Sequence, residues 1–469
     1  MKQTETFGRH STVISAAPPD LDARTRSQVS GRRRFRRISV VAITAALTLI
    51  VGFYIPVTAD ATILTLRKLA TPARILIGSG AINPDYLDDP QFASVLPEQF
   101  NSLSPENELK WQFVEPAQGS FNFTKLDRLV DFAAKHNMAV KGHGLISGGL
   151  NPPWLEQIKD PNTLRAVLKT HFETIMARYA GKMDRWDVAT EVLSTFGGTG
   201  LEHNYFYQVL GPDYLAEVYR IAHAAAPNAK LFLNESLVES YSAKRQELHD
   251  LVADLVGKGV PINGVGLEMH ETQTGPNPGV ITDMVNSYKA LGLEVAITEM
   301  DVHLTPDANS NVNQAKIYGD VIAEALAAGI RDISFWGFTD KHSYTWVPGA
   351  KPLMFDENYN PKPAFFATWT ALANFMWSSP RKALDAVKED VQGLVNAGTL
   401  DSSKAGALTN KIDSAAKQLD ADKGNGKSAV SQVESAISFA QNLVDGGGLS
   451  QSDGDGLIYE LKWVKSKLN

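Results

Sequence analysis

Eight short apolar stretches, separated by longer segments with helical spacing, constrain the fold of this chain more than any other feature of its sequence. The stretches begin at Arg74, Gln99, Met138, Arg185, Lys230, Ile262, Glu294 and Asp332, and the pattern continues to about residue 375. Segments between them, such as 125–136 and 162–180, place apolar residues three and four positions apart, as amphipathic helices do. Strand alternating with helix eight times is typical of an α/β fold, the (β/α)8 or TIM barrel. A doubly wound open sheet is the rival fold, but no glycine-rich phosphate turn follows the first stretch.

The pattern changes after residue 375. From Leu384 onward, apolar residues recur in four stripes with helical spacing, and the stripes are interrupted at Gly398, at 422–427 and at 445–448. Glycine-rich interruptions of this kind are typical of helix ends and turns. We therefore expect a barrel domain over residues 62–377, followed by a small all-α helical bundle over residues 381–469.

Residues 1–61 form a basic tail that ends in an apolar segment. An arginine-rich stretch at 31–37 precedes an uncharged apolar run at 38–57, and small residues at 57–61 suit a signal peptidase. The run is also about as long as a bilayer core is thick. We expect a signal peptide or a transmembrane anchor, and hence a protein that is secreted or is held in the membrane by residues 38–57.

The rest of the chain is acidic and contains no cysteine. The formal net charge is -7, and residues 1–61 hold nine Lys or Arg against four Asp or Glu, so the remainder carries a net charge of -12. An acidic body argues against nucleic acid as a partner. The lack of cysteine excludes a thiol nucleophile, a disulfide framework and a thiolate metal site. We expect neither a metal nor another cofactor.

Two glutamates stand at the ends of predicted strands, Glu191 after the fourth stretch and Glu299 after the seventh. In a barrel of this class the working residues lie at the C-terminal ends of the strands. One glutamate at such a place is usually structural, but two lie roughly across the mouth of one barrel. Two carboxyl groups about 5–5.5 Å apart are the arrangement that retaining glycoside hydrolysis needs.

Several longer motifs appear in order at these strand ends. They are "SPENELKWQFVEPAQGSFNF", "GH" before "PPWL", "WDV..E", "ITEMDVH", "WGFTDKHSYTW" and "PLMFDENYNPKPAF". Together they make residues 66–375 resemble glycoside hydrolase family 10, the endo-β-1,4-xylanase family. The resemblance implies a carbohydrate partner, a β-linked glycan or glycoside, that is cleaved by double displacement.

The resemblance also implies roles for particular residues. Glu191 would be the general acid/base and Glu299 the nucleophile, and we expect burial beside the opposing carboxylate to keep Glu191 protonated. His270 would orient Glu299. The positions that match sugar-binding or site-lining residues of the family are Asn107, Lys110, His143, Glu268, His270, Trp336 and Trp346. For each of these, packing or a surface salt bridge is the alternative interpretation.

The sequence departs from the family pattern around the sugar-binding cleft. Thr190 stands where the family usually has Asn, and Glu268 where it has Gln. Ser147, Gly148 and Leu150 replace a Trp-His pair and a Gln, and "NESL" from Asn234 replaces Asn-Asp-Tyr-Asn. Losing the bulky side chains leads to the hypothesis of a wider cleavage-site pocket that accepts a sugar other than unsubstituted xylose, including a glycosylated small molecule such as a saponin.

Glu268 leads to a second hypothesis. A third carboxylate near Glu299 would raise pKa values and slow nucleophilic attack unless a cation or a proton neutralises it. The alternative to an active enzyme is therefore a weakly active or non-catalytic glycan-binding relative. The helical tail, from "LVNAGTLDSSKAGALTNKIDSAAKQL" to "AVSQVESAISFAQNLV", resembles the FIMAH module of secreted bacterial carbohydrate-active enzymes.

Overall fold

The structure is a computed structural model that describes residues 65–194, 199–377, 379–396, 398–421 and 427–468. The predicted tail and apolar run at 1–61 lie outside these residues. Among the helices of the described part, none is long and apolar enough to cross a membrane. The strands are β1 Leu76–Ile82, β2 Ser102–Pro105, β3 Ala139–Ser147, β4 Met183–Thr190, β5 Lys230–Glu235, β6 Gly264–Leu267, β7 His270–Thr272, β8 Glu294–His303 and β9 Asp332–Phe335.

These strands form one closed parallel barrel. Their order in the sheet is β6-β5-β4-β3-β2-β1-β9-β8-β7, and an additional pairing of β6 with β8 closes the ring of eight strands. The short strand β7 pairs only with β8 and continues the segment that β6 begins. The predicted (β/α)8 fold is confirmed, and the open-sheet alternative is wrong. The sixth predicted stretch is two strands, β6 and β7, rather than one.

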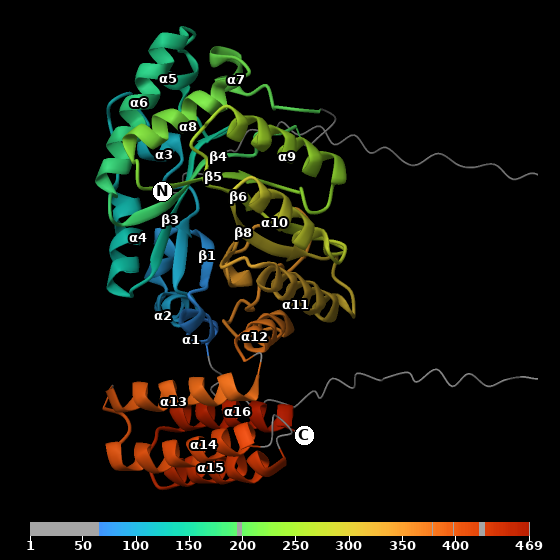
Figure 1. Ribbon diagram of the computed structural model, residues 1–469. Helices are drawn as coiled ribbons and strands as arrows, with labels where there is room; N and C mark the ends of the chain where they lie inside the picture. Colours follow the sequence, from blue (N-terminus) through green and yellow to red (C-terminus); the bar gives the residue numbers. More distant parts are fainter. Residues whose placement is uncertain (1–64, 195–198, 378, 397, 422–426, 469) are drawn as a thin grey trace, which may run out of the picture. The chain divides into compact units, whose positions relative to one another are not determined.

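Helices flank the barrel strands (Figure 1). Helix α4 buries Leu126, Leu129, Val130 and Ala133, the three- and four-residue spacing that the sequence predicts. The helices of this domain are α1 Leu66–Ala70, α2 Pro90–Gln99, α3 Trp111–Val114, α4 Thr124–Lys135, α5 Pro153–Glu156, α6 Pro161–Arg178, α7 Tyr205–Leu210, α8 Tyr214–Ala225, α9 Ser242–Gly257, α10 Val280–Ala290, α11 Ser310–Ala328 and α12 Pro363–Met376.

Four further helices form the predicted C-terminal bundle. They are α13 Pro380–Asn396, α14 Ser402–Ala421, α15 Lys427–Asp445 and α16 Gln451–Leu468. Helix α13 packs on α14 and α16, and α15 packs on α14 and α16, so the four close around a common apolar centre. Gly398 and Gly447 adopt positive φ angles after α13 and α15, a conformation that favours glycine at helix ends. The predicted boundary at residues 377–381 lies where α12 has ended, at Met376, and α13 begins, at Pro380.

Candidate active site

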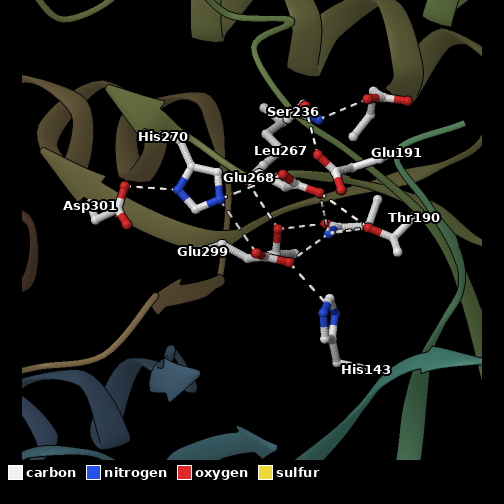
Figure 2. A network of polar contacts seen from close by, with 12 residues as sticks. His143, Thr190, Glu191, Ser236, Leu267, Glu268, His270, Glu299 and Asp301 are labelled. Atoms are coloured by element: carbon white, nitrogen blue, oxygen red, sulfur yellow. Dashed lines mark hydrogen bonds and ion pairs between the residues drawn. The ribbon is translucent and has the colours of Figure 1, made fainter. Parts of the chain in front are cut away.

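The predicted site residues gather where the barrel strands end. Figure 2 shows Glu191, Glu268 and Glu299 turned toward one another, with His143 and His270 beside Glu299. Glu191 follows β4, Glu268 follows β6, and His270 begins β7. Glu299 was expected after its strand, but it lies inside β8 together with Asp301, just as Asn234 lies inside β5 and His143 inside β3. These strands continue past their polar residues because the neighbouring strands still pair with them.

Glu299 is held at the base of this group by three neighbours. Its side chain is buried, and its Oε1 accepts a 2.8 Å hydrogen bond from Asn234 Nδ2. His143 Nδ1 lies 3.5 Å from Oε1, and His270 Nε2 lies 3.4 Å from Oε2. Burial alone would raise the pKa of Glu299, but His143, His270 and Lys141 outweigh it and hold this pKa below its usual value. The carboxylate therefore stays ionised, as a nucleophile must be.

His270 is oriented by a second carboxylate. Its Nδ1 lies 2.8 Å from Asp301 Oδ1, which leaves Nε2 facing Glu299. Burial alone would lower the pKa of His270, but Asp301 and the nearby glutamates raise it well above its ordinary value. The imidazole is thus a cation between two carboxylates. This geometry suits the orienting role predicted for His270.

Glu191 differs from Glu299 in its surroundings. It is exposed and has a φ of 50°, and its backbone N–H donates a 3.0 Å hydrogen bond to the carbonyl oxygen of Asn234. Ser236 Oγ lies 3.5 Å from Glu191 Oε1. The burial that we expected for Glu191 beside Glu299 is not found, since this residue is exposed in the structure.

A buried ion pair that the sequence interpretation missed fixes the turn after Glu191. Glu235 Oε2 accepts hydrogen bonds of 2.8 and 3.0 Å from the backbone N–H groups of Val192 and Leu193. Its other oxygen, Oε1, lies 2.8 Å from Lys244 Nζ. Burial raises the pKa of Glu235, and Lys244 partly offsets this effect. A glutamate inside the apolar strand β5 was the available signal, since such a group needs a partner.

Glu268 shares its hydrogen-bond donors with the predicted nucleophile. Asn234 Nδ2 donates to Glu268 Oε1 at 3.0 Å as well as to Glu299, and His270 Nε2 lies 3.5 Å from Glu268 Oε2. Thr190 Oγ1 donates a further 3.2 Å hydrogen bond to Oε1. Burial, then the charges of Glu299 and Glu191, raise the pKa of Glu268 well above its usual range. The Glu268 carboxyl group therefore carries a proton.

Three of the predicted sugar-binding residues, Lys110, His143 and His270, lie around Trp336, which follows β9. Lys110 Nζ lies 6.0 Å from the centroid of the Trp336 ring and donates a 3.2 Å hydrogen bond to Asn107 Oδ1. The His143 ring makes an edge contact with Trp336, with centroids 5.2 Å apart. Trp346 is 47 % exposed, and its ring centroid lies 5.7 Å from that of His270. The sugar-binding roles of these residues stay predictions.

Another buried pair supports His143. Asp187 in β4 is fully buried and lies 2.9 Å from both Lys141 Nζ and His143 Nδ1. Burial alone would raise the pKa of Asp187, but Lys141 and His143 hold it below its usual value. Asp187 and Lys141 were not among the predicted site residues, although a charge in an apolar strand again signalled a buried partner.

Three overlapping groups in the site place nitrogen and oxygen atoms within 4.8 Å of one another, a spacing that a cation also uses. They are His270 with Asp301 and His303, His143 with Asp187 and Glu299, and Glu268 with His270 and Glu299. In each group an imidazole faces carboxylates at 2.8–3.5 Å, which hydrogen bonding and charge account for. We interpret them as polar clusters, and the expectation of no metal or cofactor stays a prediction.

Comparison with known proteins agrees with the geometry. Endo-1,4-beta-xylanase B of Thermotoga neapolitana is 35 % identical over 314 residues, covering 64 % of this chain and 90 % of that protein. A beta-1,4-xylanase of Dictyoglomus thermophilum is 34 % identical over 301 residues, covering 60 % and 84 %. The crystal structure of native xylanase 10B from Thermotoga maritima is similar with a TM-score of 0.62 and 35 % identity, covering 66 % of this chain and 98 % of that one.

Two family models match separate parts of the sequence. The FIMAH domain matches residues 384–464, within the bundle of α13–α16, and the resemblance noted for the helical tail is confirmed. The model of glycosyl hydrolase family 10 matches residues 65–371, nearly the whole barrel domain. The chain therefore belongs to glycosyl hydrolase family 10, as a xylanase-like glycoside hydrolase that acts on O-glycosyl bonds.

Proposed function

We propose that this protein cleaves a β-1,4-linked glycan with retention of configuration, with Glu299 as the nucleophile and Glu191 as the general acid/base. The observation that carries the proposal is the contrast between the two carboxylates. Glu299 is buried, contacted by His143 and His270, and ionised, whereas Glu191 faces solvent at the end of β4, where water and a leaving group have access. Solved relatives in complex with xylobiose and xylotriose support a carbohydrate substrate.

In the first step Glu299 attacks the anomeric carbon while Glu191 gives its proton to the leaving oxygen. The C–O bond to the leaving group breaks, and a glycosyl ester forms on Glu299. In the second step Glu191, now a carboxylate, takes a proton from water, and the water oxygen displaces Glu299. His270 stabilises the Glu299 carboxylate before attack and again as it leaves.

The two roles are separable with aryl glycosides. A dinitrophenyl leaving group needs no proton, so Glu191→Ala should still form the glycosyl ester but hydrolyse it slowly, and added azide should restore turnover as a β-glycosyl azide. Glu299→Ala should lose about 10⁴-fold or more in kcat with every leaving group, because no nucleophile remains. Activity that persists in Glu299→Ala refutes the assignment, and a wild-type protein that binds but never cleaves favours the glycan-binding alternative.

We also propose that the subsite beside β3 accepts a larger sugar than xylose. Ser147, at the end of β3, pairs with Thr190, so the departures from the family pattern lie next to the residue that precedes Glu191. A Cβ atom added at Gly148 would meet Asn204 Cβ at 3.7 Å, an ordinary contact distance, and one added at the neighbouring Gly149 would meet no atom within 4 Å; Leu150 is exposed. Open space at these positions supports room for a hydroxymethyl arm or a decorated glycan.

The measurement is kcat/KM for xylotetraose against cellotetraose and a β-galactoside of equal length. We expect the hexosides to be cleaved at least as fast as the xyloside. A strong preference for unsubstituted xylooligosaccharides contradicts the wider subsite while leaving the hydrolase assignment intact. A saponin carrying the same sugar tests the small-molecule alternative.

We further propose that the protein is exported, a hypothesis that rests on residues 1–61 alone. The arginine-rich stretch and the apolar run at 38–57 support export, with the retained anchor as the alternative to cleavage. N-terminal sequencing of protein recovered from the medium and from membranes distinguishes the two. A protein found only in the cytoplasm contradicts both.

A further inference from the structure

His303 ends β8 and occupies a place that the predicted mechanism does not use. Residues 299, 301 and 303 alternate along one strand, so Glu299, Asp301 and His303 share one side of β8. The side chain of His303 is fully buried. Strand β7 pairs with this part of β8 in register, His270 with Asp301 and Thr272 with His303. A buried imidazole such as that of His303, beside Asp301, is expected to have polar partners for its nitrogens.

The outer side of His303 meets the loop that carries Trp346. The two rings are stacked, with centroids 3.9 Å apart and planes inclined by 27°. His303 Nδ1 lies 2.8 Å from Thr345 Oγ1, which also receives a 3.1 Å hydrogen bond from the backbone N–H of Val347. Thr345 directly precedes Trp346, whose side chain is 47 % exposed. His303 therefore contacts both the half-exposed indole and, through Thr345, the loop that holds it.

The inner edge of His303 meets the group that orients the nucleophile. Its Nε2 lies 2.9 Å from Asp301 Oδ1, the same oxygen that His270 Nδ1 contacts at 2.8 Å. Among the described residues His303 Nε2 has no hydrogen-bond partner, so we treat its approach to Asp301 as a close electrostatic contact. His270 Nε2 then lies 3.4 Å from Glu299 Oε2. A continuous series of contacts thus runs from Trp346 to Glu299.

We propose that His303 is a positioning residue that joins Trp346, a predicted sugar-binding residue, to the proposed nucleophile Glu299 through Asp301 and His270. The inference rests on the proposed function of Glu299. When a sugar packs against Trp346, the indole presses on the His303 ring, and the Nε2 edge keeps Asp301 in place for His270. Substrate contact and the ionised state of Glu299 are therefore set by one series of side chains.

The electrostatic effect of His303 has a definite sign. The polar edge of the His303 ring lies close to Asp301, and His303 is one of the groups that hold the pKa of Asp301 below its usual value against burial. An ionised Asp301 keeps His270 protonated, and protonated His270 favours ionised Glu299. Removing the polar edge of His303 should therefore raise the pH at which Glu299 loses its proton.

Other charged and titratable groups face the same series of contacts. They are Glu271 on β7, Glu268 after β6, and Tyr318 on α11, whose pKa is raised by burial and by the charge of Asp301. None of these three groups belongs to the loop that carries Trp346. They stay in place when His303 is changed, so a shift of the acid limb in a His303 variant is attributed to Asp301.

The test compares His303→Phe with Trp346→Ala in the full chain, using kcat and KM for an aryl β-xylobioside from pH 4 to 8. Phenylalanine keeps an aromatic ring to stack on Trp346 and loses both ring nitrogens. For His303→Phe we expect KM within about twofold of wild type, and the acid limb of kcat/KM displaced upward by about one pH unit, which lowers kcat/KM on that limb about tenfold. For Trp346→Ala we expect a KM raised about tenfold together with an acid limb displaced upward by less than one pH unit, because the His303 ring loses the indole that it stacks on and holds Asp301 less firmly.

His223→Phe, on the exposed surface of α8, is the matched control and should leave both quantities unchanged. Should His303→Phe fail to fold, Thr345→Val replaces it, since losing the hydroxyl that faces Nδ1 should move the acid limb in the same direction. An unmoved acid limb in the folded variant overturns the proposal. Failure of the proposed function itself is recognised separately, because Glu299→Ala would then remain active.

Discussion

Glu268→Gln isolates the effect of the third carboxyl group in the site. Glutamine has nearly the same shape, and its oxygen can still accept the hydrogen bonds that Thr190 and Asn234 give to Glu268 Oε1. What the substitution removes is the titrating proton. Burial and the charges of Glu299 and Glu191 raise the pKa of Glu268 well above its ordinary value of 4.5. The folded protein therefore keeps a proton on Glu268 that the unfolded chain releases.

The sign and size of the stability effect follow from that proton. Above about pH 4.5 the unfolded chain binds one proton fewer at this residue than the folded chain does, so the free energy of unfolding of the wild type falls as the pH rises. One proton changes this free energy by about 1.4 kcal/mol per pH unit. Glu268→Gln lacks this loss. The variant should therefore gain on the wild type by about 1.4 kcal/mol for each pH unit above pH 4.5 over which the folded protein keeps the proton.

The assay is urea denaturation of both proteins at pH 4, 5, 6 and 7, followed by tryptophan fluorescence. The difference in unfolding free energy should be nearly constant below pH 4.5 and then grow with pH. Glu98→Gln, an exposed residue of α2, is the control for the same chemical change in solvent, and its curve should run parallel to the wild type. A parallel curve for Glu268→Gln would refute the reasoning, because it would mean that the folded protein holds no extra proton there.

Three further substitutions test the supports of the site and of the bundle. Lys244→Met leaves Glu235 buried without its 2.8 Å ion pair, so the free energy of unfolding should fall by about 3–5 kcal/mol, measured by urea denaturation, and kcat should fall as the turn after Glu191 loosens. Gly266→Ala would place a Cβ atom 2.3 Å from Asn234 Oδ1, so we expect about 1–3 kcal/mol of destabilisation and a lower kcat, since Asn234 also contacts Glu299. Glu460→Gln should stabilise the bundle increasingly above pH 4.5 in thermal melts, because burial and Asp390 raise the pKa of the buried Glu460 well above its usual range.

The sequence predicted the barrel strands well but placed Glu299 after its strand, whereas β8 continues to His303. Apolar runs mark a strand only as far as its side chains remain apolar, whereas β3, β5 and β8 continue through His143, Asn234 and Glu299. Backbone pairing with the next strand continues there, as the register of Asn234 with Gly266 illustrates. Polar side chains at these strand ends are stabilised by hydrogen bonds and ion pairs with one another. The partners lie on other strands, far away in the sequence.

The same limit explains which site residues the sequence identified. Glu191, Glu299 and His270 stand in recognisable motifs, so their positions were predictable from the family resemblance. Asp187, Lys141, Glu235 and Lys244 act through buried pairs, each joining two different elements of the barrel. A lone charge in an apolar strand indicates that a partner exists, but it does not identify the partner. The exposure of Glu191 was likewise not predictable from the sequence, because it depends on the backbone conformation after β4, where Glu191 has a positive φ.

The distribution of protons in the site decides between the two hypotheses that Glu268 raised. Glu268 and Glu299 are both buried and both contact Asn234 and His270, so those shared donors do not distinguish them. They differ in their other neighbours because, of the two, only Glu299 has His143 within 3.5 Å. His143 also contacts Asp187, which forms an ion pair with Lys141. These neighbours hold the pKa of Glu299 below its usual value, while the pKa of Glu268 is raised, so the proton stays on Glu268. A third carboxyl group that is neutral does not repel the nucleophile's charge, so its presence is compatible with turnover.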